Sequence, residues 1–309
     1  MKILLTGATG FLGARLLEYF LKENYQVIII KRRSTNLNPL VERFGKLEAW
    51  DCEDDELDKL FRLHHDVDAI VHAATDYGRN GSSPTATFWA NEVFPVKLLQ
   101  LAIEHKVKLF VNMDTFFNTQ KAAYVYLGAY TLSKRHFQEW GKHCGDAGRI
   151  RFVNLRLFHL YGAGDGSEKF VPAIVRRCLA DEEIDLTDGE QRRDFIHVED
   201  VVAAVGVVVR AEIPKDAGYR HYDVGSGTSM RVRDFVESVK RLCGGNAQLN
   251  FGALPNRKGE FQDSCADTEA LKALGWKPKI NIDSGIIEVI GHIGQHGLQK
   301  KAEHQKNDY

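Results

Sequence analysis

The chain has 309 residues, about twice the usual length of one domain, so a globular protein of one and a half to two domains is expected and a peptide-sized scaffold is excluded. Hydrophobic residues make up 44% and charged residues 27% of the chain, a balance typical of a folded domain and not of a disordered or fibrous chain. The 41 Lys and Arg residues nearly cancel the 42 Asp and Glu residues, which leaves a net charge of -1. Such a chain has no overall field that attracts nucleic acid or an anionic membrane, and we expect neither as a partner.

Cysteine usage and apolar runs indicate the compartment. The five cysteines are odd in number, widely spread and free of any C-x-x-C pair, so they predict neither a disulfide framework nor a metal site. The apolar run at the N-terminus is too short for an export signal, and no run is long enough to span a bilayer. We therefore expect a cytoplasmic protein.

Short β-branched runs alternate with helical patterns through the first half of the chain. In chain order the pattern predicts strand, helix, strand, helix, strand, long helix and strand at Ile3 to Thr6, 11–23, Val27 to Ile30, 55–63, Ala69 to Val71, 86–105 and Leu109 to Asn112. Alternation of this kind indicates βαβ units and a parallel sheet. Runs such as Val27 to Ile30 are apolar at every position, as in strands that helices cover on both faces. We predict an α/β fold with a Rossmann-type, doubly wound parallel sheet.

The pattern is less regular in the second half. A helix begins near Tyr130, and a strand follows at Arg151 to Leu157. Beyond this strand, hydrophobic periodicity predicts helices near 168–180, 199–211, 231–243 and 283–295. These helices are separated by glycine-rich and charged loops, which indicates a smaller lobe.

Two lobes and a tail are expected. Residues 1–160 should form the Rossmann domain, and segments near 195–225 should return to it. Residues 161–298 should form mainly the smaller α/β lobe. The polar segment 299–309 has no apolar stripe and is expected to fray.

Glycines mark the turn between the first strand and the first helix. Segment 7–13 reads G-x-x-G-x-x-G, directly after a strand and at the start of an amphipathic helix. Glycine permits the tight turn and close backbone approach that a pyrophosphate needs, and the free N–H groups of the helix start attract its charge. A tight turn that binds nothing has the same pattern, but its place between strand and helix favours a dinucleotide. The candidate cofactor residues here are Gly7, Thr9, Gly10, Phe11, Leu12 and Gly13.

Three basic residues follow the second strand, where a NAD site usually carries an Asp or Glu for the ribose 2′-hydroxyl. This chain has Lys31, Arg32 and Arg33 there. Guanidinium groups form bidentate, charge-assisted bonds with a 2′-phosphate, which a carboxylate would repel. A solvated basic loop is the alternative interpretation. The position after the second strand favours NADP, and thus NADPH, over NAD.

A tyrosine and a lysine lie four residues apart in the helix near residue 130. Tyr130 and Lys134 therefore share one face of that helix. A nearby cation favours the phenolate, so Lys134 is expected to lower the pKa of Tyr130 toward the range of a general acid or base. Such a pair by itself is common on helix surfaces, and its meaning depends on the motifs around it.

Ordered motifs extend over nearly the whole chain. Besides segment 7–13 and the Tyr130/Lys134 pair, they are His72-Ala73-Ala74, Asn91, Leu155 to Gly162, Arg192 to Asp200, Tyr222 to Gly227 and Leu274 to Pro278. In this order they resemble the extended short-chain dehydrogenase/reductase superfamily, the NAD-dependent epimerase/dehydratase family. The segments 31–37, 112–116 and 130–134 look most like its branch of nucleotide-sugar 4-ketoreductases, which contains the CDP-abequose and CDP-paratose synthases.

The resemblance implies roles for single positions. Tyr130 would exchange a proton with the sugar carbonyl or hydroxyl, and Lys134 would lower the tyrosine pKa and bind the nicotinamide ribose. Asn91 would hold residues that contact the cofactor without touching the cofactor itself. An equally good interpretation is that Asn91 only forms hydrogen bonds in the core. The other implied cofactor residues are Asp51 and Cys52 near the adenine, and Ala73, Ala74 and Thr75.

One position departs from the family pattern. The family's catalytic Ser or Thr follows the fifth strand, and alignment places Met113 there. A thioether cannot donate a hydrogen bond. We expect the Thr115 hydroxyl to reach the substrate oxygen instead, with Asp114 as a further candidate that orients this oxygen. The alternative is that the site dispenses with the hydroxyl.

The resemblance also implies substrate contacts. Arg193 and Arg257 match positions that bind the diphosphate of a nucleotide sugar, and surface salt bridges are the alternative for both. His159 stands where relatives often carry Asn, and a core histidine is its alternative. The remaining candidates are Thr75, Tyr77, Phe170 and Val171.

The same positions distinguish between reactions. Family dehydratases carry Glu where this chain has Thr115, so the chain lacks their base for a carbon-bound proton. An epimerase recycles one held NAD and has no need of NADPH, whereas a ketoreductase consumes it. We predict NADPH-dependent reduction of a 4-keto deoxy sugar linked to CDP, dTDP, UDP or GDP, with Tyr130 as general acid. An NAD(P)-dependent epimerase and a non-catalytic NADP-binding regulator are the alternatives.

The resemblance further implies a homodimer. Relatives often pair through the helices that correspond to 86–105 and 130–144. The candidates for an apolar surface on these helices are Phe88, Phe94, Leu98, Phe137 and Trp140, and a core position is the alternative for each.

Overall fold

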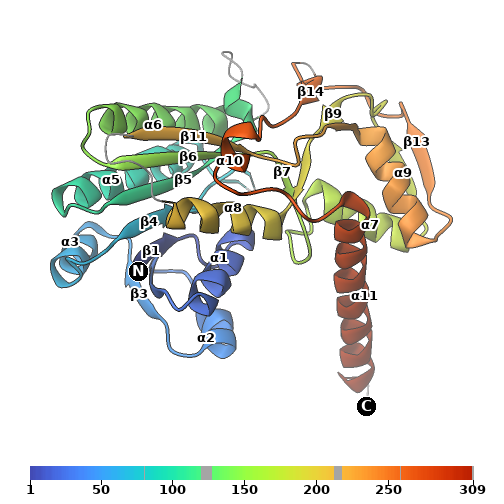
Figure 1. Cartoon of the computed structure of the whole chain (residues 1–309). Coiled ribbons are helices and arrows are strands. Elements are labelled where there is room, and N and C mark those ends of the chain that lie inside the picture. The colour runs from blue at the N-terminus through green and yellow to red at the C-terminus, as the bar shows by residue number, and fades with distance from the viewer. Residues whose placement is uncertain (80, 120–126, 212–217, 258, 308–309) are drawn as a thin grey trace. The chain divides into compact units, whose positions relative to one another are not determined.

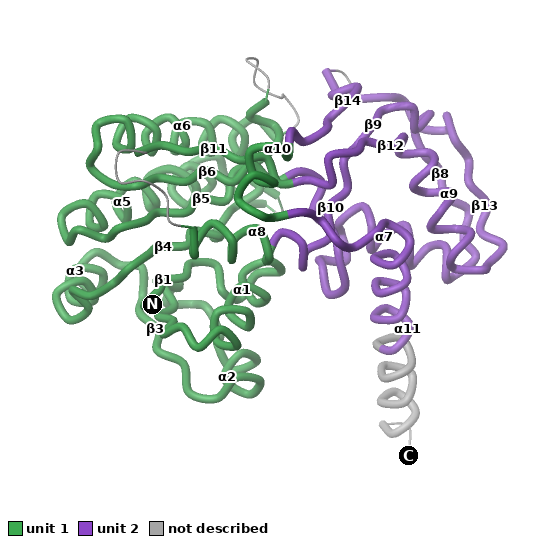
Figure 2. The backbone as a smooth tube through the Cα atoms, viewed as in Figure 1, with its two compact units in different colours: residues 1–157, 202–224, 268–276 green, residues 158–201, 225–267, 277–309 purple. Residues whose placement is uncertain are grey.

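The computed structural model describes residues 1–79, 81–119, 127–211, 218–257 and 259–307. The chain divides into two compact units (Figure 2). Unit 1 comprises residues 1–157, 202–224 and 268–276, and unit 2 comprises residues 158–201, 225–267 and 277–309. The chain thus leaves unit 1 after Leu157 and returns to it twice. The sequence analysis predicts that segments near 195–225 return to the first unit, but it does not predict that residues 268–276 also belong to that unit.

A seven-stranded sheet forms the centre of unit 1 (Figure 1). Its strands are β1 (Lys2–Thr6), β2 (Gln26–Lys31), β3 (Glu48–Asp51), β4 (Ala69–His72), β5 (Leu109–Thr115), β6 (Arg151–Leu157) and β11 (Tyr219–Val224). Neighbouring strands pair in parallel in the order β11-β6-β5-β4-β1-β2-β3, which confirms the predicted Rossmann-type fold. In such sheets a ligand crevice lies at the carboxyl ends of the strands, where the order reverses beside β1.

Helices cover both faces of this sheet. They are α1 (Phe11–Lys22), α2 (Asn38–Phe44), α3 (Asp54–Leu63), α4 (Pro84–Phe88), α5 (Phe94–Glu104), α6 (Gly128–Asp146), α8 (Val198–Arg210, of which unit 1 holds 202–210) and α10 (Glu269–Lys272). Side chains of α3, α5 and α6 share an apolar core with every second residue of the strands, including Ile70, Phe110 and Phe152. Helices α1 and α8 lie together on the opposite face (Figure 1), where Tyr19 packs directly against Gly206.

The long helix predicted at 86–105 consists of three parts. α4 ends at Phe88, one π-helical segment, η1, spans Trp89–Val93, and α5 continues from Phe94 to Glu104. Such π-segments are rare and frequently occur at functional sites. Asn91 lies in η1 and is completely buried.

Short strands and helices make up unit 2. The paired strands are β7 (His159–Tyr161) with β10 (Phe195–His197), β8 (Glu183–Leu186) with β13 (Gln248–Phe251), and β9 (Arg192–Arg193) between β12 (Met230–Arg231) and β14 (Asp263–Ser264). The helices are α7 (Phe170–Leu179), α9 (Val232–Cys243) and α11 (Ile282–Asn307).

These elements of unit 2 enclose a second core. Phe195 stacks on Phe235 with ring centroids 4.0 Å apart, and Tyr161 meets both rings edge-on. The predicted helices near 168–180 and 231–243 correspond to α7 and α9, which contribute Ile174, Val236 and other residues to this core. Helix α11 continues through residues 299–307 of the tail for which the sequence predicts fraying.

Candidate active site

The turn from β1 to α1 fits a dinucleotide phosphate. Gly7 has φ +73°, and a Cβ atom there would lie 2.6 Å from the Ala74 nitrogen. A Cβ atom on Gly13 would lie 1.9 Å from the Gly7 carbonyl oxygen, so both positions require glycine. Helix α1 begins after Gly10 without a side-chain cap and without an acidic residue in its first turn. Its first N–H groups are therefore available to an anion.

A threonine joins this turn to the end of β4. The Thr6 hydroxyl accepts a hydrogen bond from the Ala74 N–H over 3.1 Å and lies 2.9 Å from His72 Nδ1. His72 is completely buried, and burial lowers its pKa well below the usual range. Thr6, whose hydroxyl also contacts the neutral His72, thus holds Ala74 beside the glycine turn.

A cavity of about 650 Å³ lies beyond β2 and β3, and its lining includes Arg32, Arg33 and Cys52. The three basic residues predicted to bind a 2′-phosphate differ in environment. Lys31 donates to Asp51 over 2.6 Å, and Arg33 lies 3.5 Å from the same carboxylate. Lys31 also holds the pKa of Asp51 below its usual value, together with Arg33. The Arg32 guanidinium has no hydrogen-bond partner among the described residues.

Asn91 organises the segment that follows β4. Its side-chain oxygen accepts from the Asp76 N–H over 2.8 Å and from the Thr75 hydroxyl over 3.3 Å, and its amide donates to the Asp76 carbonyl over 2.7 Å. The amide also contacts the Ser133 hydroxyl of α6 at 3.2 Å. The structure therefore gives Asn91 the core hydrogen bonds that the sequence left as an equal alternative.

Tyr130 is buried at the start of α6 between two aromatic rings. The Tyr77 ring lies 5.0 Å from it, and the Phe117 ring meets it edge-on at 6.4 Å. Burial raises the pKa of Tyr130 well above its usual range, and a hydrogen bond with the Thr115 side chain opposes this shift. The expectation that Lys134 lowers this pKa is therefore wrong in this arrangement, because burial dominates. The phenol is protonated at neutral pH.

Lys134 is buried one turn further along α6. Its ammonium donates to the Met113 carbonyl oxygen over 2.5 Å. Burial lowers the pKa of Lys134 to about 8, and the Asp114 carboxylate opposes this shift. The site thus holds a lysine whose proton is exchangeable near neutral pH.

Asp114 is buried on the same side of the sheet as α6. Its carboxylate accepts from Asn154 and from Asn118, each over 2.8 Å. Burial raises the pKa of Asp114, while the Lys134 charge and these amides oppose the increase. Both carboxylate oxygens therefore have partners within unit 1.

Unit 2 brings two of the predicted substrate residues together. Arg193 is 7% exposed and donates to the Glu260 carboxylate and to the Phe261 carbonyl oxygen, both over 2.7 Å. His159 Nε2 lies 3.2 Å from the Ser264 hydroxyl. Burial, together with the Arg193 charge, lowers the pKa of His159 to about 3, so this histidine is neutral.

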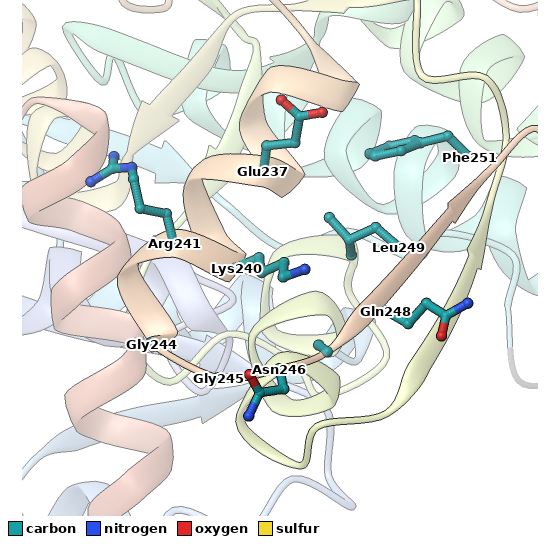
Figure 3. A pocket seen from close by; sticks show the side chains of 10 residues that line it. Glu237, Lys240, Arg241, Gly244, Gly245, Asn246, Gln248, Leu249 and Phe251 are labelled. Atoms are coloured by element: carbon teal, nitrogen blue, oxygen red, sulfur yellow. The ribbon is translucent and has the colours of Figure 1, made fainter.

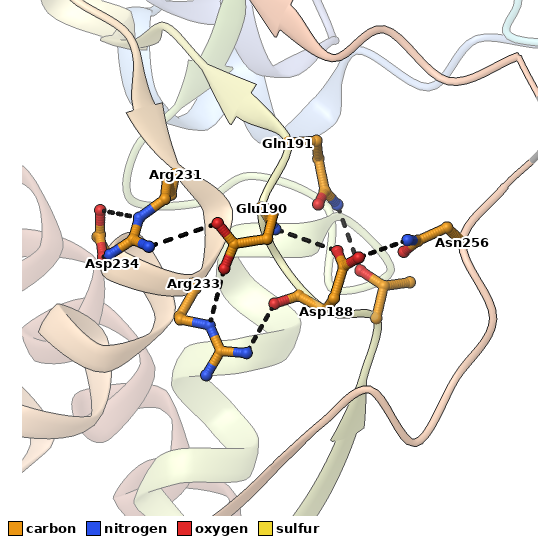
Figure 4. A network of polar contacts seen from close by, with 8 residues as sticks. Asp188, Glu190, Gln191, Arg231, Arg233, Asp234 and Asn256 are labelled. Atoms are coloured by element: carbon orange, nitrogen blue, oxygen red, sulfur yellow. Dashed lines mark hydrogen bonds and ion pairs between the residues drawn. The ribbon is translucent and has the colours of Figure 1, made fainter.

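The other predicted residues of unit 2 are spread over its surface and core. Phe170 is exposed at the start of α7, whereas Val171 lies in the core. Arg257 is exposed in a loop. The segment before Arg193 is held by ion pairs: Glu190 contacts Arg231 and Arg233 of the neighbouring elements, as Figure 4 shows.

Sequence comparison identifies the family. The NAD dependent epimerase/dehydratase family matches residues 3–225. The chain belongs to this family. It is accordingly an NAD(P)-dependent oxidoreductase of the extended short-chain dehydrogenase/reductase type.

Two relatives of this family member are CDP-abequose synthases. That of Salmonella muenchen is 34% identical over 293 residues, which cover 94% of this chain and 97% of the relative. That of Salmonella typhimurium is 36% identical over 297 residues, which cover 94% and 98%. These identities confirm the resemblance drawn from the motifs.

Solved structures of epimerases share the fold of this family member. UDP-glucose 4-epimerase of Thermotoga maritima with UDP-glucose superposes with a TM-score of 0.81 at 22% identity, over 96% of this chain and 99% of the epimerase. The Thermus thermophilus enzyme in complex with NAD has a TM-score of 0.78 at 22% identity, over 94% and 98%.

The sequence analysis does not predict several polar residues of this site. Ser133 contacts Asn91, Arg79 lies with its guanidinium 5.9 Å from the Tyr77 ring centroid, and Asn154 holds Asp114. Ser133 sits between two predicted residues of one helix, and this spacing could have revealed it. The others are distant from Tyr130 in sequence, so no local pattern marks them.

A further cavity of about 820 Å³ lies in unit 2 along α9 and β13 (Figure 3). Its lining includes Glu237, Lys240 and Arg241 and none of the predicted site residues. Within the described ranges, no group of His, Cys, Asp and Glu residues is arranged to hold a metal ion. Nor does any helix in that part of the chain have the length and apolar character needed to cross a membrane.

Proposed function

We propose that this protein reduces the 4-keto group of a deoxy nucleotide sugar with NADPH, and that Tyr130 is the general acid. The single observation that carries the proposal is the buried Tyr130 side chain, whose pKa burial raises so that its hydroxyl is protonated at neutral pH. Reduction of a carbonyl creates negative charge on its oxygen, which a preorganised O–H donor stabilises.

A bound nicotinamide dinucleotide supplies the two electrons and the hydrogen of the reduction. Tyr130 donates its proton to the sugar oxygen, and the Thr115 side chain, which lowers the pKa of the phenol against the effect of burial, helps to orient it. The Lys134 ammonium lies at the end of the same strand, where it donates a hydrogen bond to the Met113 carbonyl oxygen. The aromatic rings of Tyr77 and Phe117 exclude water from the phenol.

Arg32 supports the choice of NADPH. Its guanidinium lines the cavity beyond β2, whereas Lys31 is already paired with Asp51. An arginine without a hydrogen-bond partner can form a bidentate contact with a 2′-phosphate. Arg33, whose side chain is 72% exposed and weakly paired, can add a second contact. We further propose that segment 7–13 binds the pyrophosphate, that Asp51 and Cys52 lie near the adenine, and that residues 73–75 border the cofactor, as the family resemblance implies.

The relatives support a CDP-linked substrate. The CDP-abequose synthases are 34% and 36% identical to this chain over nearly its full length, so we infer from their name that the nucleotide is CDP. For unit 2 we propose that Arg193 and Arg257 bind the diphosphate and that the neutral His159 contacts the sugar. Because Arg193 already pairs with Glu260, this contact requires the diphosphate to compete with a carboxylate.

The test uses purified protein with NADPH or NADH and a CDP-linked 4-keto dideoxyhexose, followed by the absorbance of the reduced nicotinamide. We expect consumption of NADPH and much slower consumption of NADH. Interconversion of a sugar epimer pair without net consumption would instead identify an epimerase. Tight NADPH binding without turnover of CDP-, dTDP-, UDP- or GDP-linked keto sugars would indicate a non-catalytic regulator.

We also propose a homodimer in the cytoplasm. Of the predicted interface residues, Phe94, Leu98 and Phe137 are buried within unit 1, whereas Phe88 is half-buried and Trp140 is 46% exposed. Trp89 and Val93 of the predicted helix at 86–105 are 44% and 54% exposed and join Phe88 and Trp140 as candidates. The five cysteines are free thiols, which suits a reducing compartment. Sedimentation of the wild type and of Val93→Glu tests the dimer, and a monomeric wild type would refute it.

A further inference from the structure

Three rows of side chains cross β5, β6 and β11 on the face that α6 covers. The pairing register places Phe110, Phe152 and Tyr219 in the first row. It places Asn112, Asn154 and His221 in the second row, and Asp114, Arg156 and Asp223 in the third. The first row is a stack of aromatic rings, with centroids 5.4 Å and 6.2 Å apart. The other two rows are polar, although Asn112, Asn154 and Asp114 are buried.

A chain of hydrogen bonds runs from Arg156 through Asp223 and His221 to Asn154 and so connects the two polar rows. Arg156 donates to Asp223, whose carboxylate lies 3.0 Å from His221 Nε2. A proton on Nε2 satisfies this contact and leaves His221 Nδ1 as an acceptor. His221 Nδ1 lies 3.2 Å from the Asn154 amide nitrogen, which can donate to it. Asp223 therefore selects the histidine tautomer that accepts from Asn154.

The same amide nitrogen holds Asp114. Asn154 Nδ2 donates its second hydrogen to the Asp114 carboxylate over 2.8 Å, and Asn154 Oδ1 accepts from Asn112 over 2.7 Å. Asn154 thus has partners on both strands beside β6 and cannot turn its oxygen toward Asp114 without losing them. A buried carboxylate that accepts such donors remains ionised more readily.

We propose that Asn154 is a positioning residue of the active site, which holds the buried Asp114 carboxylate ionised as the counter-charge of Lys134. Asp114 then acts through Lys134 and does not orient the substrate oxygen, the role that the sequence suggested. The importance of Lys134 for catalysis rests on the proposed function, but its charge interaction with the neighbouring Asp114 does not.

Arg156 and Asp223 share the third row with Asp114 and pair with each other, and Asp223 also contacts His221. Lys134 interacts with Asp114 of β5 and with His72 of β4, which is neutral, and Tyr130 lies one turn before it on α6. Asp114 also raises the pKa values of Tyr130 and Tyr219. Because Asp114 is the only group that raises the pKa of Lys134 among the described residues, loss of the Asp114 charge should move that pKa further down.

The decisive measurement is the pKa of Lys134 itself, from NMR of protein labelled with carbon-13 in the lysine side chains and assigned with Lys134→Met. We expect Asn154→Leu to lower this pKa by about one unit or more, and Asp114→Asn to do the same. The double variant should show no further decrease, because both changes remove one charge. In both variants, the pH above which turnover falls should decrease by the same amount as the Lys134 pKa.

Asn112→Leu is the matched control. It removes a buried amide from the same row but leaves the contact between Asn154 and Asp114, so it should lower stability without changing the Lys134 pKa. Asn154→Ala serves as the second variant, because it removes the same donor without adding apolar bulk. An unchanged Lys134 pKa in a folded Asn154 variant would overturn the proposal. A shifted pKa in a protein that reduces no keto sugar would support it and refute only the proposed function.

Discussion

Met113 contributes its backbone to the candidate site, since the Lys134 ammonium donates a hydrogen bond to the Met113 carbonyl oxygen over 2.5 Å. A carbonyl oxygen is present whatever the side chain, so a thioether at this position leaves the contact intact. The family pattern has a hydroxyl at position 113, and we propose that Thr115, which lowers the pKa of Tyr130 against the effect of burial, replaces it. On this proposal the departure at Met113 is compatible with an intact Tyr130 and Lys134.

Thr115→Val should lower kcat by about 10- to 100-fold, because the hydroxyl that interacts with the reacting phenol is lost. Met113→Leu should change kcat by less than about threefold, since its carbonyl oxygen is retained. Steady-state reduction of the keto sugar by both variants provides the comparison. A larger loss for Met113→Leu than for Thr115→Val would reverse the assignment.

Tyr130→Phe should lower kcat by about 10²- to 10⁴-fold, because it removes the general acid. The ring contacts with Tyr77 and Phe117 remain, so folding and NADPH binding should be unchanged. Turnover, circular dichroism and NADPH fluorescence together test this expectation. A well-folded variant that keeps most of its turnover would exclude Tyr130 as the acid.

Arg32→Ala should weaken NADPH binding by about tenfold or more and leave NADH binding nearly unchanged, because only NADPH carries the 2′-phosphate. Lys31→Ala is the matched comparison: Lys31 is paired with Asp51 and should contribute less. Dissociation constants for both cofactors are measured by fluorescence titration. Equal losses for the two cofactors after Arg32→Ala would argue against a 2′-phosphate contact.

His159 should make the fold sensitive to acid. Its pKa is about 3 in the folded chain and 6.5 in an ordinary environment, so the unfolded state binds a proton first as the pH falls. Stability from this residue is therefore complete above pH 6.5 and is lost between pH 6.5 and 3, with a slope of at most about 1.4 kcal/mol per pH unit. Denaturant unfolding of His159→Asn between pH 4 and 7 should show a weaker pH dependence than the wild type.

Sequence reasoning succeeded where the signal is local. The all-apolar run of β2, the glycines of segment 7–13 and the four-residue spacing of Tyr130 and Lys134 each follow from neighbours in the chain. The α/β class and the family are confirmed by the sheet and by the match over residues 3–225. The sequence did not reveal that Lys31 is paired whereas Arg32 is not, because the partner of Lys31 is Asp51 of the neighbouring strand β3.

The sequence by itself determined the family, the glycine turn between β1 and α1, and the alternation of strands and helices in unit 1 except for α2 and β3, because these depend on periodicity and on backbone conformations that few residue types adopt. Only the tertiary structure decided the protonation of the site. The direction of the Tyr130 pKa follows from burial, and the partners of Asp114 include Asn154, 40 residues away. Such contacts arise from strand register and desolvation, which are properties of the assembled sheet and leave no pattern in the order of residues.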